Sequence, residues 1–337
     1  MTIALIIVGS VLVVGLVVLL VTLLTVERRA MAGTATLVES TGRGNVSDVL
    51  KRIRRLEIKV KHLVDESFAG SYHSVFKGQG MNFEEVREYQ PGDEIRSIDW
   101  NVTARLSEPY VKVFTEEREL TLVLVVDLSA SGNYGSDNFS KREIAAEIAA
   151  TLAFSAIGNN DRVALILFTD KVELFIPPGK GRSHVLRVIR EVLYYDPKSR
   201  KTDISIALAY LNRVITRRSI AFLISDFHAS PFHKELGLSS RRHDLTAIEI
   251  RDPLEQALPN IGRVMLEDQE TGEHLEVNTS SKALRKQFDT QVKQHQESIA
   301  SQFQLCGIDH VSLATTDDYL PALRQFFERR ERRLTHA

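Results

Sequence analysis

The sequence lacks the features of several common protein classes. It has a single cysteine, Cys306, among 337 residues, so no disulfide can form within the chain. Its 43 basic and 44 acidic residues leave a net charge of −1, which gives no general attraction to nucleic acid. The histidines form no H-x-x-x-H pair and there is no C-x-x-C pair, which argues against a zinc site. The 43% hydrophobic content is typical of a globular protein.

Glycine-rich phosphate-binding motifs are also missing. A P-loop requires G-x-x-x-x-G-K-[ST] after a strand, and a dinucleotide site requires G-x-G-x-x-G. After the apolar run that ends at Asp127, only Gly132 and Gly135 follow, and GKGR at 179–182 is better interpreted as a turn. Any ATP hydrolysis connected with this protein must therefore come from a partner.

The N-terminus carries the one long apolar run, which extends from Ile3 to Val26 without a charged residue. A helix of about 24 residues is about 36 Å long, enough for a tilted bilayer crossing. A cleaved signal peptide would need a basic residue before a shorter apolar core. Basic residues follow the run instead, which predicts a single-pass inner (cytoplasmic) membrane anchor over 1–28, with the soluble domain in the cytoplasm. A start at Met31 would give a soluble form.

Between the anchor and the main domain we expect three segments. Residues 29–45 are small and polar, which predicts a flexible linker. Residues 46–69 predict a basic amphipathic helix that packs on its own domain. Its apolar stripe consists of Val46, Val49, Ile53, Leu56, Val60 and Leu63. Residues 70–118 show no lasting helical period and predict a small β-rich segment.

Charged residues surround Trp100, the only tryptophan, within the β-rich segment. Buried ion pairs can fix geometry without catalysing anything, so we expect a structural network here, with partner docking as the alternative. Its members would be Arg87, Glu88, Asp93, Arg96, Asp99 and Arg105.

From 119 to 333 strand and helix patterns alternate. The predicted strands are apolar throughout, as in a parallel sheet covered on both faces. They lie at 120–127, 162–168, 219–225, 244–250 and 309–314, with helices near 140–157, 183–194, 203–217, 231–237, 280–304 and 318–333. A hairpin turning at Thr271-Gly272 is expected before the long helix. The fold class is α/β, a doubly wound and mostly parallel sheet whose ligands should bind beyond the carboxyl ends of its strands.

Asp127 ends the first of these strands and is followed at alternate positions by Ser129 and Ser131. A helix cap would need only one such residue, and the next helix begins well beyond Asp127. A metal site uses the whole pattern, because Mg²⁺ prefers oxygen ligands. One carboxylate and two hydroxyls are too few, so further ligands should come from neighbouring strand ends, where Thr202 and Asp226 are the candidates.

These residues resemble the metal-ion-dependent adhesion site of von Willebrand factor A domains. The resemblance implies that Ser129, Ser131 and Thr202 would bind Mg²⁺ or Mn²⁺ directly, and that Asp127 and Asp226 would act mainly through bound waters. It also implies a sixth coordination position that is left open for a carboxylate from a partner protein.

The segments from GSYHSVFKGQGMNF through YQPGDEIRSIDWNVTAR to VVDLSAS resemble the bacterial domain-of-unknown-function 58 family. That resemblance implies an adaptor that works with a MoxR-type AAA+ ATPase in protein assembly or metal insertion. We therefore expect a non-enzymatic, membrane-anchored, magnesium-dependent binding protein. The alternatives are a magnesium-dependent phosphatase-like hydrolase with Asp127 as nucleophile, and a passive envelope scaffold.

Overall fold

The computed structural model describes residues 53–60, 72, 75–76, 82–106, 108–115, 119–135, 139–229 and 231–335. The predicted anchor and linker lie outside these residues. Among the residues that are described, no helix is long and apolar enough to cross a membrane. The membrane span over 3–26 therefore stays a prediction.

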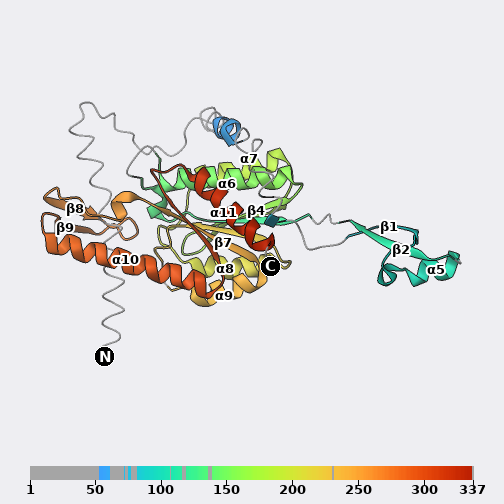
Figure 1. Ribbon diagram of the computed structural model, residues 1–337. Coiled ribbons are helices and arrows are strands. Elements are labelled where there is room, and N and C mark those ends of the chain that lie inside the picture. The colour runs from blue at the N-terminus through green and yellow to red at the C-terminus, as the bar shows by residue number, and fades with distance from the viewer. Residues whose placement is uncertain are drawn as a thin grey trace.

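A six-stranded sheet forms the centre of the main domain, in the order β10-β7-β6-β3-β4-β5 (Figure 1). All neighbouring strands are parallel except β4 and β5, which are antiparallel. Strand order reverses at β3, so the carboxyl end of β3 is the switch point at which a doubly wound sheet binds its ligands. The strands are β3 (Thr121–Asp127), β4 (Arg162–Phe168), β5 (Val172–Gly179), β6 (Ile220–Ser225), β7 (Asp244–Arg251) and β10 (Asp309–Ala314).

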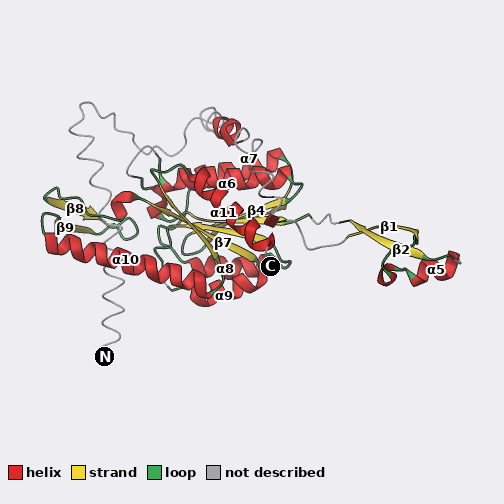
Figure 2. Cartoon of the chain, in the orientation of Figure 1, coloured by secondary structure: helices red, strands yellow, loops and turns green. Residues whose placement is uncertain are grey.

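Helices cover both faces of this sheet (Figure 2). One face packs against α6 (Lys141–Gly158), α7 (Arg182–Tyr194) and α11 (Tyr319–Thr335). The other packs against α8 (Ile204–Val214), α9 (His233–Arg242) and α10 (Lys282–Leu305). The predicted α/β class with a mostly parallel central sheet is confirmed.

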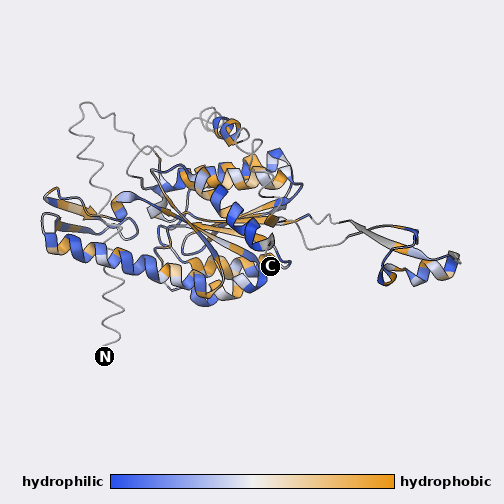
Figure 3. Ribbon diagram, in the orientation of Figure 1, coloured by the Kyte–Doolittle hydropathy of each residue, from blue (hydrophilic) through white to orange (hydrophobic). Residues whose placement is uncertain are grey.

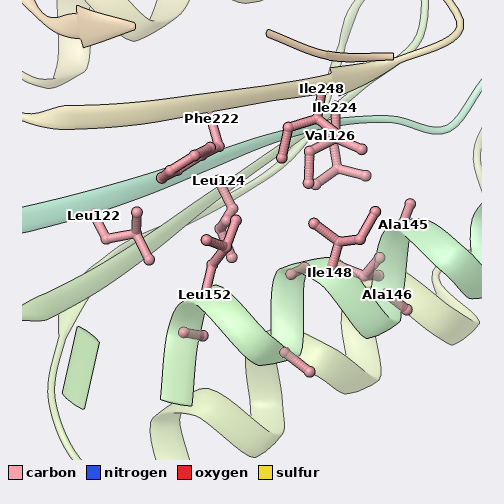
Figure 4. Packing of buried hydrophobic residues seen from close by; sticks show 14 of the residues in the cluster. Leu122, Leu124, Val126, Ala145, Ala146, Ile148, Leu152, Phe222, Ile224 and Ile248 are labelled. Carbon is pink, nitrogen blue, oxygen red and sulfur yellow. The ribbon is translucent and has the colours of Figure 1, made fainter. Parts of the chain in front are cut away.

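The central strands are buried on both faces, which explains their unbroken apolar sequences. In β3, Leu122, Leu124 and Val126 face α6, whereas Val123 and Val125 belong to the cluster on the opposite face. Figure 4 shows the first three against Ala145, Ala146, Ile148 and Leu152 of α6. Figure 3 shows the same distribution at larger scale, with apolar residues gathered on the sheet.

Leu124→Ala is expected to lower the free energy of unfolding by about 2–5 kcal/mol, since it opens a cavity beneath α6. Leu124 is fully buried. The matched control is Leu305→Ala, because Leu305 is 84% exposed and should change stability by about 0.5 kcal/mol or less. Urea unfolding followed by circular dichroism measures both. Equal losses in the two variants would contradict the assigned core.

The five predicted strands all form, and their observed ends differ from the predicted ones by one residue at most. The prediction missed β5, the antiparallel edge strand. Its side chains are mostly half-buried or exposed, and it contains the Pro177-Pro178 pair that an edge strand tolerates. Apolar runs identify strands that are covered on both faces, and β5 is not one of them.

Two further sequence predictions concern peripheral elements. Residues 53–60 are helical, and Leu56 and Val60 of the predicted stripe join the core on the α6 side. Val46, Val49 and Leu63 lie outside the described residues. The predicted hairpin is formed by β8 (Arg263–Glu267) and β9 (His274–Asn278), with Gly272 in the turn at φ +73°.

The segment before the main domain is only partly β-rich. It pairs β1 (Asn82–Glu88) with β2 (Tyr110–Thr115), but the 3₁₀ turn η2 (Ile95–Ser97) and helix α5 (Trp100–Leu106) lie between them. The Asp99 carboxylate starts α5 by accepting from the backbone N–H of Asn101 at 2.9 Å, so this short helix needs no apolar period. Arg87 and Asp93 form the expected ion pair at 2.7 Å, but Trp100 is 66% exposed and is not the buried centre of a network.

Candidate functional site

The carboxyl end of β3 holds the Asp127 carboxylate in a fixed position. Its Oδ1 accepts from the backbone N–H of Ser129 at 2.8 Å, and its Oδ2 accepts from the Ser225 hydroxyl at 2.6 Å. Burial raises the pKa of Asp127 to about 6, and the charge of Asp226 adds to this rise while the two hydrogen bonds oppose it. Hydrogen bonds to both oxygens thus fix the orientation of the Asp127 carboxylate, and burial makes its charged form unfavourable.

Two serines follow Asp127: Ser129 is the N-cap of the short 3₁₀ helix η3 (Ala130–Asn133), and Ser131 lies within that helix. Both residues are buried, and their hydroxyl oxygens are 3.0 Å apart. The backbone N–H of Ala130 donates to the carbonyl of Arg200 at 3.0 Å, which joins this loop to the loop that carries Thr202. The two predicted hydroxyl ligands therefore lie side by side in a buried place at the end of β3.

Asp226 follows β6 directly and is buried. Its Oδ1 accepts from the backbone N–H of His228 at 3.2 Å, a contact made possible by the left-handed backbone of Phe227 at φ +58°. Burial by itself would raise the pKa of Asp226, but the charges of Lys141 and His228 and a hydrogen bond from Ser131 lower it below its usual range. The strained residue turns the chain back so that the carboxylate stays at the site.

Lys141, the first residue of α6, is buried and donates to the Asp226 Oδ2 at 2.9 Å. Its ammonium also contacts the carboxylate of Glu255 in η4 (Pro253–Glu255), after β7. Burial lowers the pKa of Lys141, but the two carboxylates raise it more, so the amine stays charged. Burial raises the pKa of Glu255 to about 7, and Lys141 opposes that rise.

Thr202 lies just before α8, where Asp203 is the N-cap residue. The Thr202 hydroxyl donates to the Glu270 Oε1 at 2.9 Å. Glu270 is in the β8–β9 turn, where its backbone N–H donates to the Asp268 carboxylate at 2.8 Å. Burial raises the pKa of Glu270 to about 7, and the charges of Asp226 and Asp127 contribute to the rise. The charges of both predicted acids therefore act on the Glu270 carboxyl.

The structure gathers all five predicted residues at one end of the sheet and adds others that sequence reasoning missed. The additions are Ser225, Lys141, Glu255 and Glu270. Ser225 had a readable signal, since it is a polar residue inside an apolar strand and directly precedes Asp226. The other three come from distant segments, and only the fold brings them to this place.

The charge and chemistry of the site fit a hard cation. Asp226 and Glu255 contact the Lys141 ammonium, whereas the Asp127 and Glu270 carboxyl groups have no basic partner among the hydrogen bonds described above, so acidic groups outnumber basic ones at the site. Hydroxyl and carboxylate oxygens are the ligands that Mg²⁺ prefers. Among the described residues, no group of three or more His, Cys, Asp or Glu side chains is arranged to hold a metal ion. A cation here would therefore depend on the three hydroxyls together with the two acids.

These features define a class of protein. The chain is a doubly wound α/β protein with a polar site at the switch point of its sheet. It belongs to the family described as protein of unknown function DUF58, whose model matches residues 85–298.

The relatives of this chain cover different shares of it. An uncharacterized protein of Mycobacterium tuberculosis strain H37Rv is 33% identical over 296 residues, which cover 86% of this chain and 93% of the relative. An uncharacterized protein of Bacillus subtilis strain 168 is 29% identical over 107 residues, covering 32% of this chain and 25% of the relative.

Solved structures with a similar fold include von Willebrand factor A domains. The type A domain from Catenulispora acidiphila has a TM-score of 0.33 at 10% identity and covers 66% of this chain and 43% of that one. BatB from Bacteroides thetaiotaomicron has a TM-score of 0.39 at 12% identity, and the match covers 63% of this chain and 99% of the BatB chain. Similarity at this level carries no argument about function.

Proposed function

We propose that this protein is a non-enzymatic, Mg²⁺- or Mn²⁺-dependent adaptor that captures a partner protein through a metal-ion-dependent adhesion site. The metal would be held by Asp127, Ser129, Ser131, Thr202 and Asp226. When bound, it would supply a Lewis-acidic position that attracts an incoming carboxylate. The observation that carries the proposal is the buried group of oxygen donors at the carboxyl ends of β3 and β6, which are Asp127, Ser129, Ser131 and Asp226. The loop that carries Thr202 is joined to this group by the hydrogen bond from Ala130 to Arg200.

The spacing of the donors supports this assignment. Adjacent ligands of an octahedral ion that lie about 2.1 Å from the metal are about 3.0 Å from each other. The hydroxyl oxygens of Ser129 and Ser131 are 3.0 Å apart, which suits two ligands of one ion. The excess of buried carboxylates gives the cation a further electrostatic reason to bind.

The phosphatase-like alternative is less well supported. It requires Asp127 as a free nucleophile, yet both of its carboxylate oxygens accept hydrogen bonds that hold the group and reduce its reactivity. It also requires a general acid two residues later, where the chain has Ser129. A passive scaffold would need none of these buried polar groups, which are costly to bury.

The membrane anchor over 3–26 and the MoxR-type AAA+ ATPase partner complete the proposal. The anchor is supported by the apolar N-terminal run, with the soluble domain in the cytoplasm and no nucleic-acid partner. The ATPase is supported by the family resemblance. Protein assembly or metal insertion would then be driven by the ATPase, with this chain providing the capture site.

Removal of the metal is expected to abolish partner capture. A crosslinking pull-down with the full-length protein in millimolar Mg²⁺ should recover a partner that is lost in EDTA and regained when Mg²⁺ is restored. Without any partner, saturating Mg²⁺ should raise the thermal midpoint, because a ligand at about 100 times its Kd adds about 2.7 kcal/mol of stability. Capture that persists in EDTA, or a midpoint that Mg²⁺ leaves unchanged, would contradict the proposal.

A further inference from the structure

We propose that Glu270 is an internal carboxylate ligand for the open position of the metal site, so that the β8–β9 hairpin competes with a partner's carboxylate. The inference rests on the proposed function and adds a regulatory element to it. In this form the protein is self-capped, and capture of a partner requires displacement of the hairpin tip.

The contact between Glu270 and Thr202 carries the inference. The Glu270 Oε1 lies 2.9 Å from the Thr202 Oγ, which is itself one of the proposed ligand atoms. That separation is an ordinary hydrogen-bond length, and it is also compatible with the distance of about 3.0 Å between neighbouring ligands of an octahedral ion. Glu270 thus presents a carboxylate oxygen directly beside one of the proposed ligand atoms. It does so from a segment 68 residues away in sequence from Thr202.

The hairpin tip is built to hold the Glu270 backbone in place. The Asp268 carboxylate accepts from the N–H groups of Glu270 at 2.8 Å and Thr271 at 3.2 Å. The Asp268 carbonyl accepts from the N–H of Gly272 at 2.7 Å. A turn fixed by three hydrogen bonds presents the Glu270 side chain at low entropic cost.

The hairpin is docked onto the same loop that carries the serines. Tyr134 directly follows η3 and shares a buried cluster with Val264 and Leu266 of β8 and Val277 of β9. This cluster is small and separate from the two that flank the main sheet. Figure 1 shows the hairpin at the end of the domain, beside the start of α10 and opposite the β1–β2 hairpin. A small satellite contact of this kind can open without disturbing the central core.

Tethering explains how one carboxylate can keep others out. A group held on a short connection has an effective concentration of about millimolar or higher. Free carboxylates at low concentration would not displace Glu270, whereas a partner that adds further contacts would. The hairpin would in this way select for a partner of sufficient affinity.

The test uses full-length protein, with Mn²⁺ alone as the probe and acetate as the competing carboxylate. Glu270→Ala should weaken Mn²⁺ binding about tenfold, the order seen when a carboxylate that supports a metal site is removed. Water-proton relaxation should report one more exchangeable water on the bound Mn²⁺. Acetate at roughly tens of millimolar, above the effective concentration of the tether, should restore affinity in Glu270→Ala and leave wild type unchanged.

Glu273→Ala is the matched control, since Glu273 is an exposed glutamate of the same turn and should behave as wild type. Glu270→Gln keeps the side-chain shape, so it repeats the test if the alanine variant fails to fold. Equal Mn²⁺ affinity and equal hydration in wild type and both Glu270 variants would overturn this inference alone. Absence of Mn²⁺ binding in wild type would overturn the proposed function as well.

Discussion

Asp127→Asn is expected to abolish Mg²⁺ binding and leave the fold intact. The substitution keeps the shape of the side chain but removes one of the two charges that would neutralise the cation. Isothermal titration of the purified protein should show binding for wild type and no measurable heat for the variant. Asp289→Asn on the exposed surface of α10 is the matched control and should bind Mg²⁺ as wild type does. Binding that survives in Asp127→Asn would exclude Asp127 from the site.

In the metal-free protein, Asp127→Asn is expected to favour the folded state instead of impairing the protein. The pKa of Asp127 is raised to about 6 because of burial and the charge of Asp226, whereas an unfolded chain has an Asp pKa of about 3.9. The folded state therefore binds more protons between about pH 4 and pH 6, and stability falls as the pH rises through that window. Asn lacks this pH-dependent loss of stability, which amounts to about 3 kcal/mol at most.

Urea unfolding in EDTA at about pH 4 and pH 8 measures this difference. Above pH 6, metal-free Asp127→Asn should be at least as stable as wild type, and the gap should close toward pH 4. A variant that is less stable than wild type at pH 8 would show that the Asp127 charge stabilises the fold by itself, which would remove the electrostatic reason for a cation.

Much of the fold and part of the site can be predicted from local sequence. Strands buried on both faces have to be apolar throughout, so β3, β4, β6, β7 and β10 are visible as uninterrupted runs. Because parallel strands end at a common edge, the acids Asp127 and Asp226 at the ends of two such runs are expected to meet. The exposed edge strand β5 and the short helix α5 lack that burial signal.

The charge balance of the site could not be predicted, since it depends on tertiary contacts. Lys141 and Glu255 are 114 residues apart, and each is an ordinary charged residue in its own segment. Glu270 lies in a polar hairpin turn whose sequence indicates only that it is exposed. Because these side chains are buried together at the edge of the sheet, their charges interact strongly. No local sequence pattern predicts that burial.

Lys141→Met is expected to cause the largest loss of stability of any single charge removal at the site. Lys141 and both of its carboxylate partners have side chains no more than 5% exposed. Removing one partner from a buried ion pair costs about 3–5 kcal/mol, since the remaining charge is left buried without compensation. Urea unfolding in EDTA measures the loss. The matched control is Lys59→Met, whose side chain is 51% exposed and pairs with Glu147. It should cost about 1 kcal/mol or less.

A second substitution or added Mg²⁺ should each restore stability to the Lys141→Met variant, if its loss of stability arises from carboxylates left without a positive partner. Glu255→Gln in the same chain removes one of the stranded charges, so the double variant should be more stable than Lys141→Met alone. Mg²⁺ should stabilise Lys141→Met more than it stabilises wild type, because the cation then takes over from the ammonium in neutralising Asp226. If Mg²⁺ stabilised both proteins equally, Lys141 and the cation would not act on the same carboxylate. Lys141 would then be a structural residue outside the proposed metal site.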